Sequence, residues 1–195
     1  MVARRPAPGT RERILDVAAR LFGERGVRAV GMQQVVDETG LGKSLLYREF
    51  PGKDDLVAAW LRESDAQWWQ AVDNVTGRHA GDPARQLLAI VELAHERVLS
   101  PGFQGCTFYN TSAEFRDPVH PGRQEAVAHL QRMRERFRTL ARGAGAAEPD
   151  RLADTLMLVI AGLYANGAAL GPDGPADLAV STAKAVIDQH LAETP

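Results

Sequence analysis

The sequence predicts an all-α fold of about nine helices in 195 residues. Apolar residues recur at helical spacing along most of the chain, and no segment shows the alternation that is typical of a strand. Glycine and proline residues break the helical pattern between these segments. The breaks favour two domains, a small helical domain in residues 1–56 and a larger helical domain in residues 57–195.

The first predicted helix covers residues 10–25 and ends at Gly26, because glycine can adopt the left-handed conformation that ends a helix. We expect the hydroxyl of Thr10 to cap its N-terminus. Residues three and four apart share a helix face, so this helix has one apolar side. That side consists of Ile14, Leu15, Ala18, Leu21 and Phe22.

Two short helices follow, separated by a glycine turn. The first has Val35 and Val36 on its apolar side and ends at Thr39-Gly40, and the second ends at Pro51-Gly52. The second helix restarts the apolar period with Leu41, Leu45 or Leu46, and Phe50. Its polar side chains fall mostly on the opposite arc, as Lys43, Ser44, Tyr47 and Arg48. A short helix with such an arc, behind a tight turn, is typical of an element that enters the major groove of DNA.

These residues carry a close resemblance to a known family. The segments Gly40-Leu41-Gly42-Lys43, Leu46-Tyr47-Arg48, Phe50-Pro51 and Lys53-Asp54 resemble the signature of the tetracycline-repressor (TetR) family. The resemblance covers roughly residues 10–56. It implies an N-terminal helix-turn-helix DNA-binding domain of three helices and a C-terminal helical domain for ligand binding and dimerisation. The implied function is transcriptional repression by a homodimer that a small-molecule effector releases from a palindromic operator on double-stranded DNA.

The resemblance also implies roles for single residues. Lys43, Ser44 and Leu45 start the recognition helix, where side chains reach base edges. Phosphate contacts are expected from Tyr47, Arg48 and Lys53, although Arg48 could instead read guanine. The predicted DNA-binding set is completed by Thr10 and Gln33.

The sequence departs from the family pattern at several positions. The family usually has Thr, Ser, Thr and His where this chain has Gly31, Gly42, Leu45 and Glu49. These departures favour an alternative function, a helical ligand-binding or interaction module whose helix-turn-helix no longer recognises specific DNA. Phosphate contacts could instead be restored by three further cations, Arg4, Arg5 and Arg28.

Charge is distributed unevenly along the chain. The formal net charge of the whole protein is -2. Residues 1–60 contain ten Lys or Arg and eight Asp or Glu, which gives +2 and leaves -4 for the rest. This asymmetry is consistent with a DNA-facing N-terminal end.

Helical segments continue after residue 56. One begins at Leu56 and runs toward Arg78, and others cover residues 87–99, 106–115 and 127–140. The last two helices follow from Pro149 onward, with a break between them at residues 171–174. Small side chains on the penultimate helix would let another helix approach closely. With the family resemblance, they predict a dimer interface, whereas a core helix of a monomer is the alternative. The predicted interface residues are Leu158, Ala161, Gly162, Ala165 and Ala169.

An effector site is expected around the segment Gly105–Phe115. Cys106, Asn110 and Glu114 recur every four residues and so share one helix face. They are similar to a Gly-Cys, Asn, Glu run in one branch of the family, in which this helix borders the ligand cavity. Asn110 and Glu114 would then offer polar contacts, and the apolar wall would come from Trp68, Phe103, Tyr109, Met133, Phe137 and Tyr164. Alternatively, these aromatic residues form plain core and Glu114 faces water.

An enzyme is not expected. His95-Glu96 lacks the second histidine of a zinc-protease helix, and a single cysteine, Cys106, cannot complete a structural zinc site or an intrachain disulfide. No metal and no cofactor are predicted. The apolar run 156–170 is shorter than the roughly 20 residues that a membrane span needs. The N-terminus does not resemble a secretory signal, so a cytoplasmic protein without membrane contact is expected.

Overall fold

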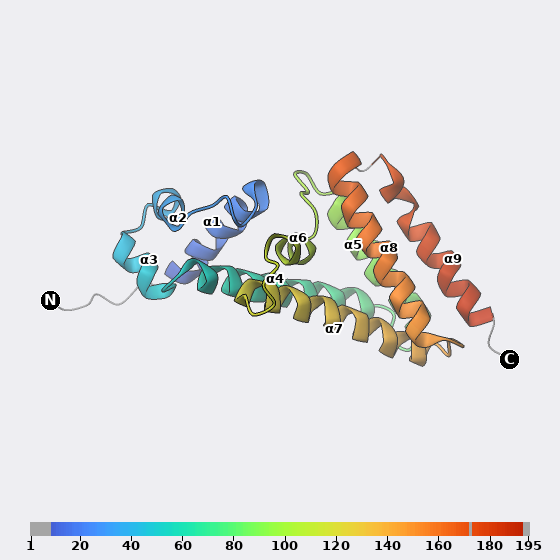
Figure 1. Ribbon diagram of the computed structural model, residues 1–195. Helices are drawn as coiled ribbons and strands as arrows, with labels where there is room; N and C mark the ends of the chain where they lie inside the picture. The colour runs from blue at the N-terminus through green and yellow to red at the C-terminus, as the bar shows by residue number, and fades with distance from the viewer. Residues whose placement is uncertain (1–8, 172, 193–195) are drawn as a thin grey trace. The chain divides into compact units, whose positions relative to one another are not determined.

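The computed structural model describes residues 9–171 and 173–192, which form nine α-helices, one short 3-10 helix and no strand (Figure 1). The predicted all-α fold with about nine helices is therefore confirmed. The elements are α1 (Thr10–Arg25), α2 (Met32–Thr39), α3 (Lys43–Glu49), α4 (Lys53–Gly77), α5 (Pro83–Val98), α6 (Thr107–Glu114), α7 (Pro121–Gly143), α8 (Pro149–Leu170), η1 (Pro175–Leu178) and α9 (Ala179–Ala192).

The helices form two compact units, and none of the three boundaries between them along the chain coincides with residue 56. The first unit contains the described residues up to Asp65 together with Thr107–Val127. The second unit contains Ala66–Cys106 and the described residues from Ala128 onward. Consequently α6 belongs to the same unit as α1, α2 and α3, whereas α4 and α7 each begin in the first unit and end in the second.

The core of the first unit is built from the apolar sides of α1, α2 and α3 and the start of α4. Ile14, Leu21 and Leu46 have no exposed side-chain surface, and Val35 and Phe50 are almost as deeply buried. The predicted helix ends at Gly26 and Gly40 are correct, and both residues have positive φ angles of 80° and 64°. Glycine adopts this conformation without the steric cost that a Cβ atom adds.

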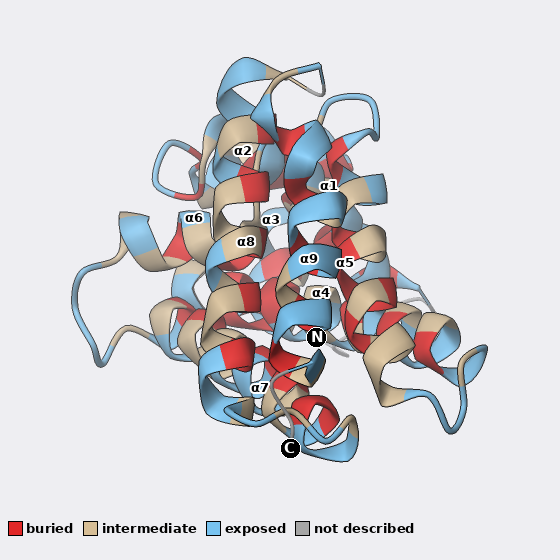
Figure 2. Cartoon of the chain, turned by 90° about the vertical axis from the view of Figure 1, so that its right-hand side faces the viewer, coloured by how far each residue is buried: buried red, intermediate tan, exposed pale blue. Residues whose placement is uncertain are grey.

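The second unit packs α5, α8 and α9 against one another. Buried residues lie where these three helices meet, and most of α9 that faces the viewer in Figure 2 is exposed. Gly167 of α8 makes a close approach possible, because a Cβ atom there would lie 2.3 Å from Cγ1 of Val98 in α5. The glycine is therefore required by the packing of α8 on α5.

One described helix, α8, is long and apolar enough to be a candidate membrane span, with a mean hydropathy of 1.4 over an 18-residue window. Its Leu152, Leu156 and Leu163 are buried in the second unit. Core helices of globular proteins satisfy the same criterion of length and hydropathy, so packing against α5 and α9 accounts for its composition.

Candidate nucleic-acid interface

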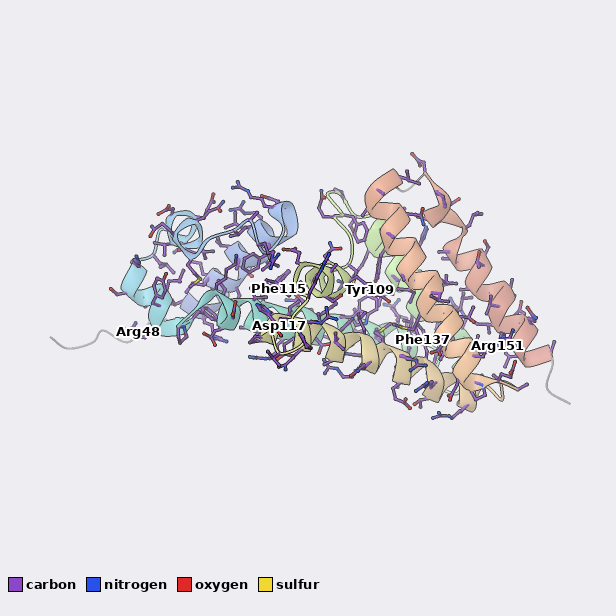
Figure 3. The ribbon with its side chains drawn as sticks, in the orientation of Figure 1. Arg48, Tyr109, Phe115, Asp117, Phe137 and Arg151 are labelled. Carbon is purple, nitrogen blue, oxygen red and sulfur yellow. The ribbon has the colours of Figure 1, made fainter. Side chains whose placement is uncertain are left out.

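Helix α3 presents one polar arc outside the core of the first unit. Lys43, Ser44, Tyr47 and Arg48 are exposed, whereas Leu46 is completely buried. Successive residues of a helix are rotated by about 100°, so Ser44 and Arg48 each lie about 160° from Leu46 around the helix axis. These two side chains occupy the centre of the exposed arc, and Tyr47 and the half-buried Leu45 flank it. Figure 3 labels Arg48 on this helix.

Two arginines of α1 hold the ends of α2 and α3. Nη2 of Arg13 donates to the carbonyl oxygen of Thr39 at 2.6 Å, at the last residue of α2. Nη1 of Arg11 lies 3.5 Å from the carbonyl oxygen of Glu49, the last residue of α3, and its guanidinium lies 4.5 Å from the ring centre of Phe50. Cations at helix C-termini satisfy free carbonyl groups and interact favourably with the helix dipole. Thus α1 fixes both helices of the helix-turn-helix.

The prediction that Thr10 caps α1 is wrong. Gly9 occupies the N-cap position with φ of 83° and makes no side-chain cap hydrogen bond. Thr10 is instead the first residue of α1, with only 6% of its surface exposed. Of the other predicted DNA-binding residues, Gln33 is exposed on α2 and its Nε2 donates to Oδ1 of Asp37 at 2.9 Å.

Lys53 is already engaged within the first unit. Its ammonium group donates to the carbonyl oxygen of Arg28 at 3.3 Å, and the residue is half-buried. Burial lowers the pKa of Lys53 from its ordinary value, and the nearby carboxylates of Glu114 and Asp54 oppose this change. Lys53 therefore contacts the scaffold of the helix-turn-helix, in addition to any contact with phosphate.

Three of the four positions that depart from the family pattern, all except Leu45, lie at helix ends. Gly31 and Gly42 are the N-caps of α2 and α3, and neither supplies a capping side chain. Replacing a capping hydroxyl by glycine costs only a few tenths of a kcal/mol. Glu49 is half-buried, and Arg28 is exposed. Arg4 and Arg5 lie outside the described residues.

Most residues predicted for the apolar wall of the effector site belong to the second unit. Trp68, Met133, Phe137 and Tyr164 are buried there, and Nε1 of Trp68 donates to Sδ of Met133 at 3.0 Å. The half-buried Phe103 lies with its ring centre 5.8 Å from that of Tyr164. Burial of this kind is compatible with a cavity wall and with plain core. Figure 3 labels Phe137 on α7.

The predicted polar stripe has a different environment. Cys106 directly precedes α6 and is half-buried, Asn110 is exposed, and Tyr109 is half-buried. Glu114 is hydrogen-bonded to the backbone of the first unit. Its Oε1 accepts a hydrogen bond from the backbone N–H of Val27 at 3.1 Å, and its Oε2 accepts one from Arg28 at 2.7 Å.

The residues predicted for a dimer interface lie on one side of α8. Leu158 is 73% exposed, Ala165 and Ala169 are exposed, and Ala161 and Gly162 are partly exposed. A Cβ atom on Gly162 would meet no atom of the same chain within 4 Å. The packing of this subunit therefore does not explain the small residue at position 162.

Sequence reasoning missed the contacts made by Arg11, Arg13 and Glu114. Each of these side chains binds a backbone group that lies distant in sequence, and backbone groups leave no trace in a residue pattern. A further missed feature is His95 of α5, whose Nε2 atom is buried without a hydrogen-bond partner in the described part of the chain. Within the same part, no group of three or more His, Cys, Asp or Glu side chains could hold a metal ion.

Comparison with known proteins gives a consistent result. The family described as "Bacterial regulatory proteins, tetR family" matches residues 14–60. Among curated relatives, the HTH-type transcriptional regulator BetI of Brucella abortus is 26% identical over 95% of this chain and 91% of its own. The HTH-type transcriptional repressor KstR2 of Rhodococcus jostii is 28% identical over 69% of this chain and 63% of its own.

Solved structures extend the similarity to the whole fold. A TetR-family transcriptional regulator from Streptomyces coelicolor superposes with a TM-score of 0.86 and 28% identity, over 97% of this chain and 92% of that one. A TetR-type regulator from Streptomyces avermitilis gives a TM-score of 0.80 and 30% identity, over 92% of this chain and 97% of that one. The similarity therefore extends over both compact units.

Proposed function

Because the chain belongs to the TetR family of DNA-binding transcriptional regulators, we propose that it is a repressor that a small-molecule effector releases from a palindromic operator. In this proposal a homodimer binds the operator with one α3 helix in each half-site. The carrying observation is the exposed arc of α3, centred on Ser44 and Arg48, on a scaffold that α1 holds at both helix ends. Repression, rather than activation, is supported by the name of one relative.

We propose that Arg48 and Leu45 contact base edges. The guanidinium of Arg48 can donate two hydrogen bonds to O6 and N7 of guanine, the commonest specific contact in the major groove. Leu45, at the edge of the arc, is suited to the methyl group of thymine rather than to a polar base edge. Lys43 and Tyr47 are suited to phosphate contacts, which fix the position of the helix without reading sequence.

We propose that the outer side of α8 forms the dimer interface. Leu158 and the small residues Ala161, Gly162 and Ala165 leave an apolar surface that this subunit does not cover. A two-fold homodimer presents two copies of α3, and consecutive major grooves on one side of DNA are roughly 34 Å apart. This spacing explains why a palindromic operator fits such a dimer.

The effector is proposed to bind in the second unit, among Trp68, Phe103, Met133, Phe137 and Tyr164. Small-molecule sites are mostly apolar with a few polar groups. His95 of the same unit is a candidate for one such group, because its buried Nε2 has no protein partner among the described residues. The effector can shift the protein only by binding one conformation better than the other. Helix α4 is continuous from Lys53 in the first unit to Gly77 in the second and so connects the two covalently.

The first test is selection of bound duplexes from a random DNA pool by the purified protein at near-physiological salt. We expect a palindromic consensus that the Arg48→Ala variant does not enrich. Glu12→Ala is a suitable control, since Glu12 is an exposed residue of α1. The alternative function, an interaction module with a degenerate helix-turn-helix, predicts no consensus, or the same consensus with and without Arg48.

A further inference from the structure

The turn between α1 and α2 is completed by a residue of α6. Gly26 ends α1, and the next two backbone N–H groups, those of Val27 and Arg28, both point at the carboxylate of Glu114. The N–H of Val27 donates to Oε1 at 3.1 Å, and the N–H of Arg28 donates to Oε2 at 2.7 Å. Glu114 is 86 residues after Arg28, and both residues belong to the first unit. A local turn of the DNA-binding domain therefore depends on a side chain from a distant helix.

The residue Arg28 is held from two further sides. Its carbonyl oxygen accepts the hydrogen bond from Lys53, the first residue of α4. Its guanidinium lies 5.6 Å from the ring centre of Phe115, which directly follows Glu114 and is labelled in Figure 3. The N–H, the carbonyl group and the side chain of Arg28 thus contact α6, α4 and the residue after α6. This arrangement fixes the chain direction just before α2 begins.

The carboxylate suits this position chemically. The two N–H donors each meet a separate acceptor atom, and a carboxylate offers two oxygens that make charge-assisted hydrogen bonds. Gly26 leaves room for it, because a Cβ atom at Gly26 would lie 3.2 Å from Oε1 of Glu114. Gly26 also has φ of 80°, a conformation that favours glycine whatever space is available. A glutamine would leave one N–H facing another donor.

We propose that Glu114 is a positioning residue for DNA recognition, which holds the α1–α2 turn and thereby the orientation of α2 and α3. This inference rests on the function proposed above. It assigns to Glu114 a contact inside the DNA-binding unit in place of a contact with the effector. Because Glu114 is the last residue of α6, any displacement of α6 removes acceptors from two backbone N–H groups. The conformation of the turn and the position of α6 are therefore linked.

The test compares Glu114→Gln with Glu24→Gln in the full-length protein. Glu24 is an exposed residue near the end of α1 whose carboxylate pairs with Arg20, so both variants remove one negative charge from the first unit. Losing a negative charge alone strengthens binding to DNA phosphates. We expect Glu114→Gln to weaken binding to the selected operator roughly tenfold, as the loss of a charge-assisted hydrogen bond would. Glu24→Gln should bind as wild type or more tightly.

Two further measurements separate positioning from unfolding. Affinity for a non-specific duplex should not fall in Glu114→Gln, whereas global unfolding would lower specific and non-specific affinity together. Hydrogen exchange at the amides of Val27 and Arg28 should accelerate. Glu114→Asp keeps the charge on a shorter side chain, and we expect it to lose operator affinity as well; it replaces Glu114→Gln if that variant does not fold.

The outcomes distinguish the two proposals. If the wild type selects an operator and Glu114→Gln binds it with unchanged affinity, the positioning role is overturned while the proposed function stands. The same conclusion follows if specific and non-specific affinity fall by the same factor. If the wild type selects no sequence, both proposals are overturned.

Discussion

Some side chains of the DNA-binding unit contact DNA, and others support the helices that contact it. Lys53 illustrates the difference. The family resemblance assigns it to phosphate, whereas its ammonium group bonds to the carbonyl oxygen of Arg28 in a half-buried position. Lys43 is exposed on the first turn of α3. The two lysines therefore form a natural pair for separating support from phosphate contact.

We expect Lys53→Gln to weaken operator binding without changing its salt dependence, because a supporting lysine releases no counterion. Lys43→Gln should reduce the slope of log K against log salt concentration by about one per subunit, as the loss of a phosphate contact does. Titrations at several salt concentrations measure both. A reduced slope for Lys53→Gln would show that it contacts phosphate directly.

At the scale of elements, α8 contains two glycines with opposite surroundings. A Cβ atom on Gly167 would lie 2.3 Å from Val98, whereas one on Gly162 would meet nothing in the same chain. Gly167→Ala should therefore destabilise the protein by about 1–3 kcal/mol through overpacking. Gly162→Ala should not destabilise the subunit and can gain about 0.5–1 kcal/mol from helix propensity.

Urea unfolding of both variants tests this contrast, and a destabilised Gly162→Ala would contradict it. Because folding and dimerisation can be coupled, the measurement is made over a range of protein concentrations. A loss of stability that appears only at protein concentrations at which the subunits associate would place Gly162 in a contact between subunits.

The elements also show what the sequence can and cannot predict. The ends of α1 and α2 were predictable because Gly26 and Gly40 mark them, and the polar arc of α3 was predictable from helical spacing. The membership of α6 in the first unit was not, since no residue pattern indicates that the carboxylate of Glu114 accepts hydrogen bonds from the backbone N–H groups of Val27 and Arg28. The spacing of small residues in α8 likewise does not tell which glycine contacts α5.

At the scale of the whole molecule, the proposed dimer can be tested at its most exposed apolar residue. Leu158→Arg should shift the protein toward monomers and weaken operator binding, because a charge at a subunit interface loses its hydration. Val119→Arg is a matched control, since Val119 is 70% exposed in the loop before α7. Sedimentation velocity gives the oligomeric state, and a dimer that survives Leu158→Arg would exclude this side of α8 as the interface.

The first unit is discontinuous in sequence, because residues 107–127 complete a unit that begins at the N-terminus. This has a consequence for synthesis on the ribosome. The chain emerges from its N-terminal end, so α1, α2 and α3 leave the ribosome well before Glu114 is translated. Until then the amides of Val27 and Arg28 lack their acceptor. The domain that contacts DNA thus reaches its final structure only after residues 107–127 have been made.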